Sequence, residues 1–580
     1  MRSDVRRPIA CLAAAAAAAV IVSCSSPQAP PPPPPAAQSP AVEVSFTDVT
    51  SSPGITFTHV SGAFGKKYLP ETMGAGVAVL DYDADGLSDL YFVNGDYWPD
   101  DPRGRRGPAT PALYRNLGGG AFADATAQAG LARPAYGMGV SAADYDNDGD
   151  TDLFVSALGP DLLFRNDAGR FTEIGEQAGV ADPGFGSSAA FLDHDHDGDL
   201  DLFVCNYVEW TRQTDIFCSL DGQNKSYCTP ESYKGQSSRL YRNDGRGRFT
   251  DASREAGVLN PSGKSLGVTT LDYDGDGWED IAVANDTQPN YLYRNNRNGT
   301  FTDMGREAGI AFSESGVARG AMGIDSADYD FSGRDSLVIG NFSNEMVGLY
   351  HNEGSGLFID DAPRAGVGLP SLLTLAFGAF FFDHDLGGDL DIFVANGHVE
   401  DDINRVQKDI TYAQRPHLFR NQGDGTFVAT APRPEADDPL AREIVARGAA
   451  YLDFDGDGDL DIAVTANNGP AHLLRNDGGS ESSWVRVKLV GARSNRDGIG
   501  ARVLVTAGGR TMQALVKTGA SYCSQSEAVL TFGLGPGGQA DRIDVIWPGG
   551  GRQVLDRPAA RTLHVIREAP EQRLAGTRHR

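Results

Sequence analysis

One short acidic sequence recurs seven times along this chain and restricts the folds open to it. The copies begin at Asp81, Asp144, Asp193, Asp272, Asp328, Asp383 and Asp453, so they recur every 49 to 79 residues. Each copy lies between two apolar runs, as in 76–80 and 90–93. Recurrence at this interval indicates a row of equivalent supersecondary units.

Each unit continues with a Leu-aromatic-Arg-Asn segment, such as 240–243, a Gly-rich turn and a Phe-Thr-Asp segment, such as 249–251. Short runs rich in Val, Phe, Tyr and Leu between Asp-Gly and Asn-x-Gly turns are typical of strands. Four short strands per unit predict the blades of an all-β, seven-bladed propeller. The seventh unit lacks its Phe-Thr-Asp segment, whereas an unpaired copy at 46–49 precedes the first unit. We expect this N-terminal strand to complete the last blade and close the ring.

The acidic loops predict calcium sites. Positions 1, 3, 5 and 9 are Asp and position 6 is Gly, which permits a sharp bend and lets hard oxygen ligands converge. Position 12 is an apolar strand residue such as Phe92, where an EF-hand has Glu, so these are hairpin loops rather than EF-hands. The loops 81–89, 144–152, 193–201, 272–280 and 453–461 are complete, and 383–391 is a plausible sixth. We expect five to six Ca²⁺ ions.

The expected ligands are side-chain carboxylates, with the backbone carbonyl of position 7 as a further ligand. They are Asp81, Asp83, Asp85, Leu87 and Asp89; Asp144, Asp146, Asp148, Asp150 and Asp152; Asp193, Asp195, Asp197, Asp199 and Asp201; Asp272, Asp274, Asp276, Trp278 and Asp280; Asp383, Asp385, Asp389 and Asp391; and Asp453, Asp455, Asp457, Asp459 and Asp461.

Two loops depart from the pattern. The loop at 328–336 has Ser332 and Ser336 at positions 5 and 9, so we expect a weak or absent site, and the loop at 383–391 has Gly387 at position 5. His194, His196 and His384 offer a zinc alternative. They stand at even positions, which we expect to face outward, and this disfavours zinc.

These repeats resemble the FG-GAP/VCBS family of calcium-binding repeats, related to the integrin α-subunit propeller, over roughly 46–478. Beyond them, 495–503, 519–525, 532–535 and 547–550 resemble the ASPIC/UnbV domain. The combination is similar to the bacterial relatives of cartilage acidic protein. The resemblance implies a seven-bladed propeller followed by a small β-rich domain, with calcium as the bound ion and no established reaction. Cys523 departs from the apolar residue expected there.

Alternating apolar residues in 484–489 and 502–506 independently predict a compact β domain at 480–567. The propeller then spans 46–479, and the polar segment 568–580 is expected to form a flexible tail.

The N-terminus reads as an export signal. Residues 1–23 combine a basic start with an apolar stretch, and Ile21-Val22-Ser23-Cys24 resembles a bacterial lipobox. Cys24 would then be lipidated and hold the protein on the periplasmic or cell-surface side of a bacterial membrane. An ordinary secretory signal with an incidental cysteine is the alternative. The Pro-rich segment 24–45 reads as a tether.

Three long insertions, at 95–112, 207–238 and 397–416, join the second and third strands of their units. In a propeller blade these connections lie on the face opposite the acidic loops, and variable loops on a rigid scaffold often carry binding. On this face we consider His398 and the Asn residues that follow the second strands as ligand candidates. These are Asn94, Asn206, Asn285, Asn341, Asn396 and Asn467. The alternative is that each Asn closes a turn through the backbone.

The remaining cysteines suggest one disulfide. Cys218 and Cys228 lie ten residues apart in the longest insertion of an exported chain, so we favour their pairing. A Cys205–Cys218 pairing stays open, because connectivity is not readable from sequence. Cys205 itself lies in a core strand.

The charge of the chain indicates which classes of partner it can bind. The net charge is −28, which disfavours nucleic acid as a partner. The seven loops hold 31 of the 78 acidic residues and one of the 50 Lys and Arg residues, Arg334, which leaves 47 acidic against 49 basic residues elsewhere. The sequence thus predicts a membrane-tethered, calcium-binding module for an extracellular glycan or protein. The alternative is a polysaccharide lyase or hydrolase on the insertion face, with His398, Glu400, Tyr412 and His417 as an acid/base set.

Overall fold

The structure, a computed structural model, describes residues 44–569 except 53, 105, 106 and 108. The expected signal peptide, Cys24, nearly all of the tether and the end of the tail lie outside the described residues. None of the helices in the described part of the chain has the length and apolar character needed to cross a bilayer. They are single turns: η1 (Leu69–Thr72), α1 (Thr126–Ala129), α2 (Gly175–Ala178), η2 (Pro230–Ser232), α3 (Gly368–Ser371), η3 (Ile403–Arg405), η4 (Pro434–Ala436), η5 (Pro439–Ala441) and η6 (Gly479–Glu481).

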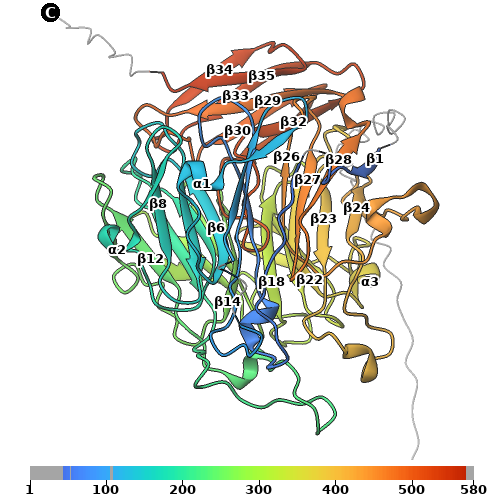
Figure 1. The fold of residues 1–580 in the computed structure, drawn as a ribbon. Helices are drawn as coiled ribbons and strands as arrows, with labels where there is room; N and C mark the ends of the chain where they lie inside the picture. The colour runs from blue at the N-terminus through green and yellow to red at the C-terminus, as the bar shows by residue number, and fades with distance from the viewer. Residues whose placement is uncertain (1–43, 53, 105–106, 108, 570–580) are drawn as a thin grey trace, which may run out of the picture. The chain divides into compact units, whose positions relative to one another are not determined.

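Seven antiparallel four-stranded sheets follow one another along the described residues, one for each acidic loop (Figure 1). This confirms the all-β, seven-bladed fold. Blade 1 contains β2 (Val77–Leu80), β3 (Asp89–Phe92), β4 (Ala112–Asn116) and β5 (Phe122–Asp124); blade 2 contains β6 (Gly137–Ala143), β7 (Asp152–Ala157), β8 (Leu162–Asn166) and β9 (Phe171–Glu173); blade 3 contains β10 (Gly186–Leu192), β11 (Asp201–Asn206), β12 (Arg239–Asn243) and β13 (Phe249–Asp251).

The later blades repeat the plan. Blade 4 contains β14 (Ser265–Leu271), β15 (Asp280–Asn285), β16 (Tyr291–Asn295) and β17 (Phe301–Asp303); blade 5 contains β18 (Ala321–Ala327), β19 (Ser336–Asn341), β20 (Gly348–Gly354) and β21 (Leu357–Asp360); blade 6 contains β22 (Ala376–Phe382), β23 (Asp391–Asn396), β24 (His417–Asn421) and β25 (Phe427–Ala429); blade 7 contains β26 (Ala446–Leu452), β27 (Asp461–Ala466), β28 (His472–Asp477) and β1 (Ser45–Asp48).

The N-terminal strand forms the outer edge of the last blade. β1 pairs antiparallel with β28, with Phe46 opposite Asn476, and Phe46 is buried. The innermost strands of neighbouring blades lie side by side in order, and β26 of blade 7 lies against β2 of blade 1. Because the first and last blades also share an apolar cluster that includes Val77 and Leu452, the ring closes on itself.

Beyond the propeller, the chain forms two further sheets. One has the order β32 (Leu530–Gly535), β29 (Ser483–Val490), β35 (Thr562–Arg567); the other has the order β31 (Arg510–Leu515), β30 (Arg502–Ala507), β33 (Ala540–Ile546), β34 (Arg552–Asp556). Val485, Val503 and Trp547 are among the buried side chains of their common core. This is the β-rich C-terminal domain expected from the alternating pattern.

The C-terminal domain covers the propeller face that carries the acidic loops, which we call the loop face (Figure 1). Arg486 pairs with Asp453 of blade 7, and Arg502 Nη2 lies 3.0 Å from Asp272 of blade 4. Trp484 lies over Gly458, and the Gly535 N–H donates to the carbonyl of Leu386 in blade 6. The acidic loops are therefore enclosed between two domains.

One C-terminal segment, residues 517–527, enters the axis of the propeller, and we call it the axial segment. The Tyr522 hydroxyl donates 2.7 Å to the carbonyl of Met73, and the Cys523 N–H donates 2.9 Å to Ser188. A Cβ on Gly76 would lie 1.8 Å from the carbonyl oxygen of Cys523. The glycines of the innermost strands thus make room for this segment.

The opposite face, which we call the insertion face, carries the three long insertions. The blade 3 insertion, green at the foot of Figure 1, extends furthest from the blades. The Tyr227 hydroxyl donates 3.0 Å to Glu71, and the Tyr227 N–H donates 2.8 Å to Glu400 of the blade 6 insertion. Lys67 Nζ lies 2.5 Å from Glu400. Segments from blades 1, 3 and 6 are thereby tied together over this face.

Candidate metal centre

Each acidic loop is a hairpin connection folded around the carboxylate at position 1. Asp144 accepts the N–H groups of Asp148 at 2.9 Å and of Gly149 at 2.7 Å, and Asp193 and Asp272 accept the same pair of N–H groups in their own loops. The glycine at position 6 has a positive φ in all seven loops, for example 105° at Gly149. Only glycine adopts this conformation at low cost, which explains the invariant residue of the repeat.

The aspartate at position 9 joins the loop to its own blade. In blade 2, Asp152 accepts the N–H of Tyr145, at loop position 2, at 3.2 Å and that of Asn166, at the end of β8, at 2.7 Å. The same two bonds occur in every blade except blade 5, where Ser336 accepts the Asn352 N–H instead. Position 9 therefore has a structural role besides its expected role as a ligand.

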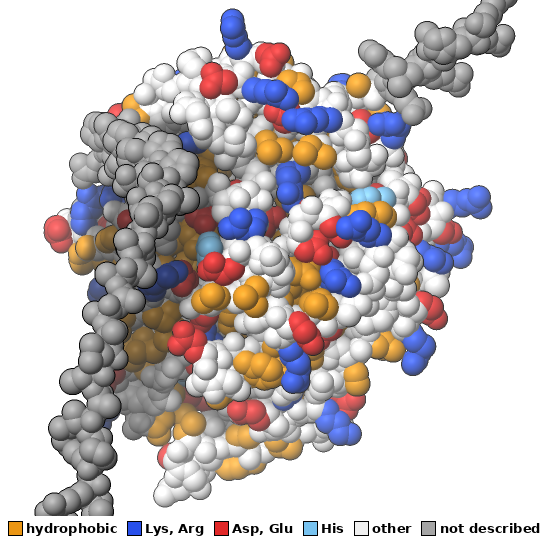
Figure 2. Space-filling view, turned by 180° about the vertical axis from the view of Figure 1, so that it is seen from behind, with side chains coloured by type: hydrophobic (Ala, Val, Ile, Leu, Met, Phe, Trp, Pro, Cys, Tyr) orange, Lys and Arg blue, Asp and Glu red, His pale blue; other side chains and the backbone are white. Residues whose placement is uncertain are grey.

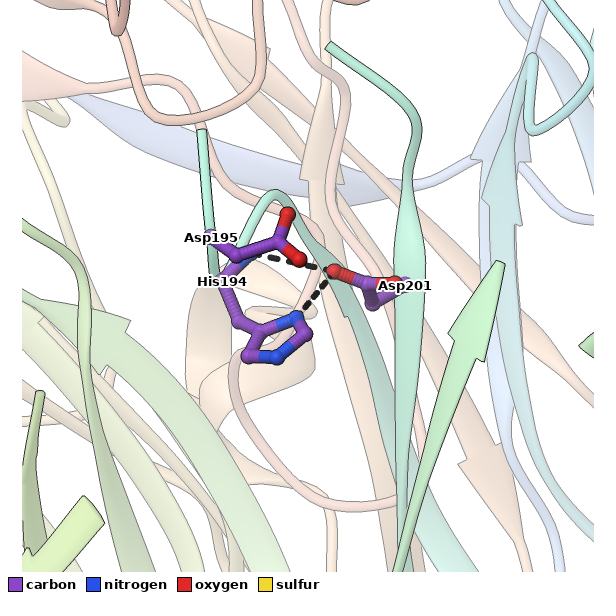
Figure 3. A group of neighbouring side chains, drawn as sticks. All are labelled: His194, Asp195 and Asp201. Atoms are coloured by element: carbon purple, nitrogen blue, oxygen red, sulfur yellow. Dashed lines mark hydrogen bonds and ion pairs between the residues drawn. The ribbon is translucent and has the colours of Figure 1, made fainter. Parts of the chain in front are cut away.

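The expectation that even positions face outward was wrong for position 2. His194 is buried, and Figure 3 shows its ring directed at Asp201, with which it forms a hydrogen bond; His384 makes the equivalent bond to Asp391. Position 2 is buried because its side chain fills the space between blades. His194 lies against Phe301, as Tyr145 lies against Phe249. His196, at position 4, stacks on Trp278 at 3.7 Å.

Four of the seven position 3 carboxylates have a buried oxygen without a donor among the described residues. One buried side-chain oxygen in each of Asp83, Asp146, Asp195 and Asp455 lacks a hydrogen-bond partner among the described residues. Asp81 and Asp459 have one too, and Asp459 is fully buried. Burying a carboxylate oxygen without a donor is costly unless a cation compensates it. The oxygens of positions 1, 3 and 5 also cluster within 4.8 Å, as in Asp81, Asp83 and Asp85.

The enclosed carboxyls are poor acids. Burial raises the pKa of Asp89 and of Asp280 to about 8, that of Asp152 to about 9 and that of Asp193 to about 7. Burial also raises the pKa of Asp459, to about 8. Carboxyls that resist ionisation when alone are stabilised in the ionised form by a bound cation. Hard oxygen donors of this number and spacing fit Ca²⁺.

Positions 5 and 7 bond within the loop or to the adjacent turn. Asp148 accepts the N–H of Asp150, while Asp150 accepts the N–H of Ala168 in the turn after β8. Several loops also carry a protein cation: Arg115 contacts Asp83 and Asp85 at 2.6 and 2.8 Å. A bound ion would compete with these arginines.

The two divergent loops differ from each other. In blade 5, His351 Nε2 lies 2.8 Å from Asp330, so one loop carboxylate already has a side-chain partner, and Arg334 at position 7 donates to the carbonyl of Asn352. In blade 6, Gly387 and Gly388 donate to Asp383, which keeps the fold of a complete loop. His384, Asp385 and Asp391 place possible ligand atoms within 4.8 Å of one another.

The Asn residues proposed as ligand candidates close loops instead. All six are buried, and each donates its amide to a backbone carbonyl, so the idea that they face a ligand is corrected. Asn94 donates to Thr110, Asn206 to Ser237, Asn285 to Pro289, Asn341 to Met346, Asn396 to Arg415 and Asn467 to Glu71.

The residues named for an acid/base set do not converge on an open site. His398 is 1% exposed; its Nδ1 accepts the Glu400 N–H and its ring packs against Phe342, so it does not face a ligand either. His417 lies beside Thr374, 3.2 Å from its hydroxyl. Burial lowers the pKa of both imidazoles to about 4.

The predicted disulfide is confirmed. A disulfide joins Cys218 to Cys228 in the blade 3 insertion, and Cys205 and Cys523 are buried free thiols.

Sequence reasoning missed the docking of the C-terminal domain on the loop face. Its cationic contacts to the acidic loops come from strands and include Arg486 and Lys488 of β29, Arg502 of β30 and Arg510 of β31. The signal was present, because these bases occupy the polar positions of strands whose other face is apolar, and their partners are the acidic loops. Figure 2, which views the molecule from behind, shows acidic and basic side chains intermixed rather than a field of one sign.

Comparisons with known proteins agree with this architecture. The FG-GAP-like repeat family matches residues 81–155, 213–283, 272–339 and 383–464, and the ASPIC and UnbV family matches 491–573. Cartilage acidic protein 1 of Mus musculus is 26% identical over 336 residues, 56% of this chain and 49% of the relative. The Homo sapiens protein is 27% identical over 306 residues, which make up 52% of this chain and 43% of the relative. The chain spans about half the length of these curated relatives or less.

Solved structures show more distant likeness. An Agrocybe aegerita lectin studied for recognition of non-reducing terminal N-acetylglucosamine is 18% identical with a TM-score of 0.34, over 62% of this chain and 80% of that one. The structure of YCF48 bound to D1 peptide is 10% identical with a TM-score of 0.38, and the match covers 76% of this chain and 96% of that one. At such scores the likeness carries no argument about function. The two family matches lie in the propeller and in the C-terminal domain, so the chain joins FG-GAP-like repeats to an ASPIC and UnbV domain.

Proposed function

We propose that this protein is an exported, membrane-tethered calcium-binding propeller that serves as a binding module for an extracellular glycan or protein. The observation that carries the calcium part is the set of buried position 3 oxygens without a donor, in Asp83, Asp146, Asp195 and Asp455. Four loops at equivalent places share this feature, so one chemical cause accounts for all of them.

Calcium would bind between the two domains. The carboxylates at positions 1, 3 and 5 would hold the ion, with position 9 and the position 7 carbonyl completing the oxygen set. The complete loops of blades 1, 2, 3, 4 and 7 fit this role best, and the loop of blade 6 fits as a sixth. The loop of blade 5 fits least, because Ser332 and Ser336 replace two carboxylates and His351 already pairs with Asp330.

The position of the C-terminal domain supports a ligand on the insertion face. The loop face lies under that domain and the axis holds the segment 517–527, so the insertion face is the propeller end left to solvent.

Calorimetric titration of the purified protein with Ca²⁺ tests the first part. We expect five to six sites, with dissociation constants of about 10⁻⁴ to 10⁻³ M as in other extracellular calcium modules. Asp83→Asn and Asp195→Asn should each remove one site, whereas the control Ser332→Ala should remove none. An unchanged stoichiometry in both aspartate variants would sink the calcium assignment.

The binding role needs a separate experiment. The calcium-loaded protein is passed over arrays of glycans and of extracellular proteins, with and without chelator. Retention that requires an intact insertion face supports the proposal. Ligand turnover, seen as new reducing or unsaturated ends, would overturn the pure binding role.

A further inference from the structure

We propose that a cleft beside the blade 3 insertion binds a neutral saccharide. This inference rests on the proposed binding role of the insertion face and names a site and a ligand class for it. The cleft has a volume of about 500 Å³, within the usual range for small-ligand sites. Phe185, Trp210 and Tyr233 form its apolar floor, and the rim includes Glu209, Thr211 and Lys234.

Hydrogen bonds from the polar atoms of Trp210 and Tyr233 hold the floor in place. Trp210 Nε1 donates 3.2 Å to Asp215, and the Tyr233 hydroxyl lies 3.5 Å from the same carboxylate oxygen. The two side chains are 6% and 9% exposed, so each shows only part of its surface to the cleft. Because both polar ends are engaged inside the protein, what faces the cleft is carbon surface in a fixed orientation.

The wall that carries Asp215 is fixed by two further links. Lys225 forms an ion pair with Asp215, and the Cys218–Cys228 disulfide joins the two sides of the same insertion. Ile216, which lines the cleft, is 40% exposed. A cleft ordered before binding loses little entropy when a ligand enters, which favours a specific site over an adaptable surface.

The rim combines opposite charges with hydroxyl and amide groups. Glu209 and Lys234 are neighbours beside an isolated bridge, since the Glu209 N–H donates 2.9 Å to the Lys234 carbonyl. Both side chains are exposed, and neither makes a side-chain bond to another residue in the described part of the chain. The pair contributes no net charge, so the cleft attracts neither an anion nor a cation overall, while it offers both a strong donor and a strong acceptor.

These features together select a saccharide. A sugar ring presents C–H groups on one face, which suit an aromatic floor, and hydroxyls around its edge, which suit a rim of donors and acceptors. An extended peptide is disfavoured, because the backbone N–H groups of Glu209 and Gln236 at this cleft already donate to carbonyls and no free strand edge is offered. An acidic sugar is disfavoured by the balancing carboxylate of Glu209.

Saturation-transfer NMR on the calcium-loaded full chain tests the proposal. The probes are methyl β-glucoside, methyl β-galactoside, N-acetylglucosamine and cellotriose, with trigalacturonate and trialanine as comparators. We expect at least one neutral sugar to bind with a dissociation constant at or below about 1 mM, and to bind better than both comparators. Lys234→Ala and Glu209→Gln should weaken it about tenfold each, as expected when one hydrogen bond to a charged group is lost.

Two controls keep the outcomes distinct. Lys408→Ala alters an exposed lysine of the blade 6 insertion and should leave saccharide binding unchanged. Full affinity in both cleft variants, or no binding of any neutral sugar, overturns this inference. If an extracellular ligand is still retained by the insertion face in that case, the proposed binding role survives without the cleft; if no ligand is retained by any part of that face, the binding role fails as well.

Discussion

The side-chain amide of Asn116 donates 2.8 Å to the backbone carbonyl of Phe454, across the junction between the first and the last blade. Every blade repeats this bond: the Asn at or near the end of the third strand donates to the position 2 carbonyl of the preceding blade's acidic loop, at 2.7–3.1 Å. The Asn of the Leu-aromatic-Arg-Asn segment therefore links neighbouring blades. Through this bond each acidic loop contacts the next blade as well as its own.

Replacing Asn116 at the junction between the first and last blades should lower the stability of the propeller. Asn116→Ala leaves the buried carbonyl of Phe454 without its donor, so we expect a loss of about 1–3 kcal/mol in the free energy of unfolding. Urea denaturation measures it. Asn404→Ala, at an exposed position of the blade 6 insertion, is the control and should change little. Equal stability of the two variants would contradict the role given to Asn116.

The N-terminal strand should be essential for stability. Removing residues 44–50 deletes β1, uncovers the edge of β28 and takes Phe46 out of an apolar cluster. We expect a sharply lower melting temperature in calorimetry. Deletion of the polar segment 570–580 serves as the comparison, and a melting temperature unmoved by loss of β1 would contradict the closure.

Calcium should stabilise the protein in a pH-dependent way. Burial raises the folded-state pKa of Asp89 and Asp280 to about 8 and that of Asp193 to about 7. Without calcium the folded state binds these protons more tightly than the unfolded state, so folding becomes less favourable as the pH rises from about 4 towards 8. Calcium needs the ionised carboxylates. The gain in melting temperature on adding calcium should therefore be largest near pH 8 and shrink towards pH 5.

The difference between calcium-loaded and chelated samples isolates the loops. Buried His59 and His398, whose pKa values burial lowers to about 3 and about 4, contribute to both samples and cancel. At a calcium concentration one hundred times the dissociation constant, each site contributes about 2.7 kcal/mol. A calcium effect that grows as the pH falls would refute this account.

Docking of the C-terminal domain should depend on Arg486, which contacts Asp453 of the blade 7 loop and Glu527 of the axial segment. Arg486→Gln leaves two buried carboxylates without their cation, a change that typically costs about 3–5 kcal/mol. Limited proteolysis should then cleave between the domains. Arg493→Gln, at a half-exposed arginine paired with Glu568, is the matched control. Resistance to protease in both variants would contradict the interdomain role of Arg486.

A side chain at Gly76 should prevent the axial segment from packing in the axis of the propeller. Gly76→Ala places a Cβ 1.8 Å from the Cys523 carbonyl oxygen, a distance that forces the backbone apart. We expect loss of stability well beyond that of Gly549→Ala, where nothing lies within 4 Å of the added carbon. Thermal unfolding of the two variants decides the matter, and similar melting temperatures would show that the segment has room to move.

The sequence predicted the blades and loops because both depend on local spacing. The alternation of Asp81, Asp83 and Asp85 and the strand runs around them lie within a few residues of one another. It did not predict the burial of His194, because period-two reasoning holds for strands and the loop turns at position 4. The docking of Arg486 on Asp453 is a contact between domains. The alternating pattern of β29 shows a basic polar face, but it does not say which part of the chain lies against that face. Nor did the sequence predict that Gly76 leaves space for the carbonyl of Cys523, because this contact also joins distant parts of the chain.

The path of the axial segment sets an order of assembly. The first strand of the ring, β1, pairs with β28, more than 400 residues later, and the segment that fills the axis comes later still. A growing chain therefore cannot complete its ring until residue 477 has emerged, and cannot fill the axis until residue 527 has followed. A chain broken off before residue 477 lacks the full partner of its own first strand, and one broken off before residue 527 lacks part of the segment that fills the axis, so neither can form the complete fold.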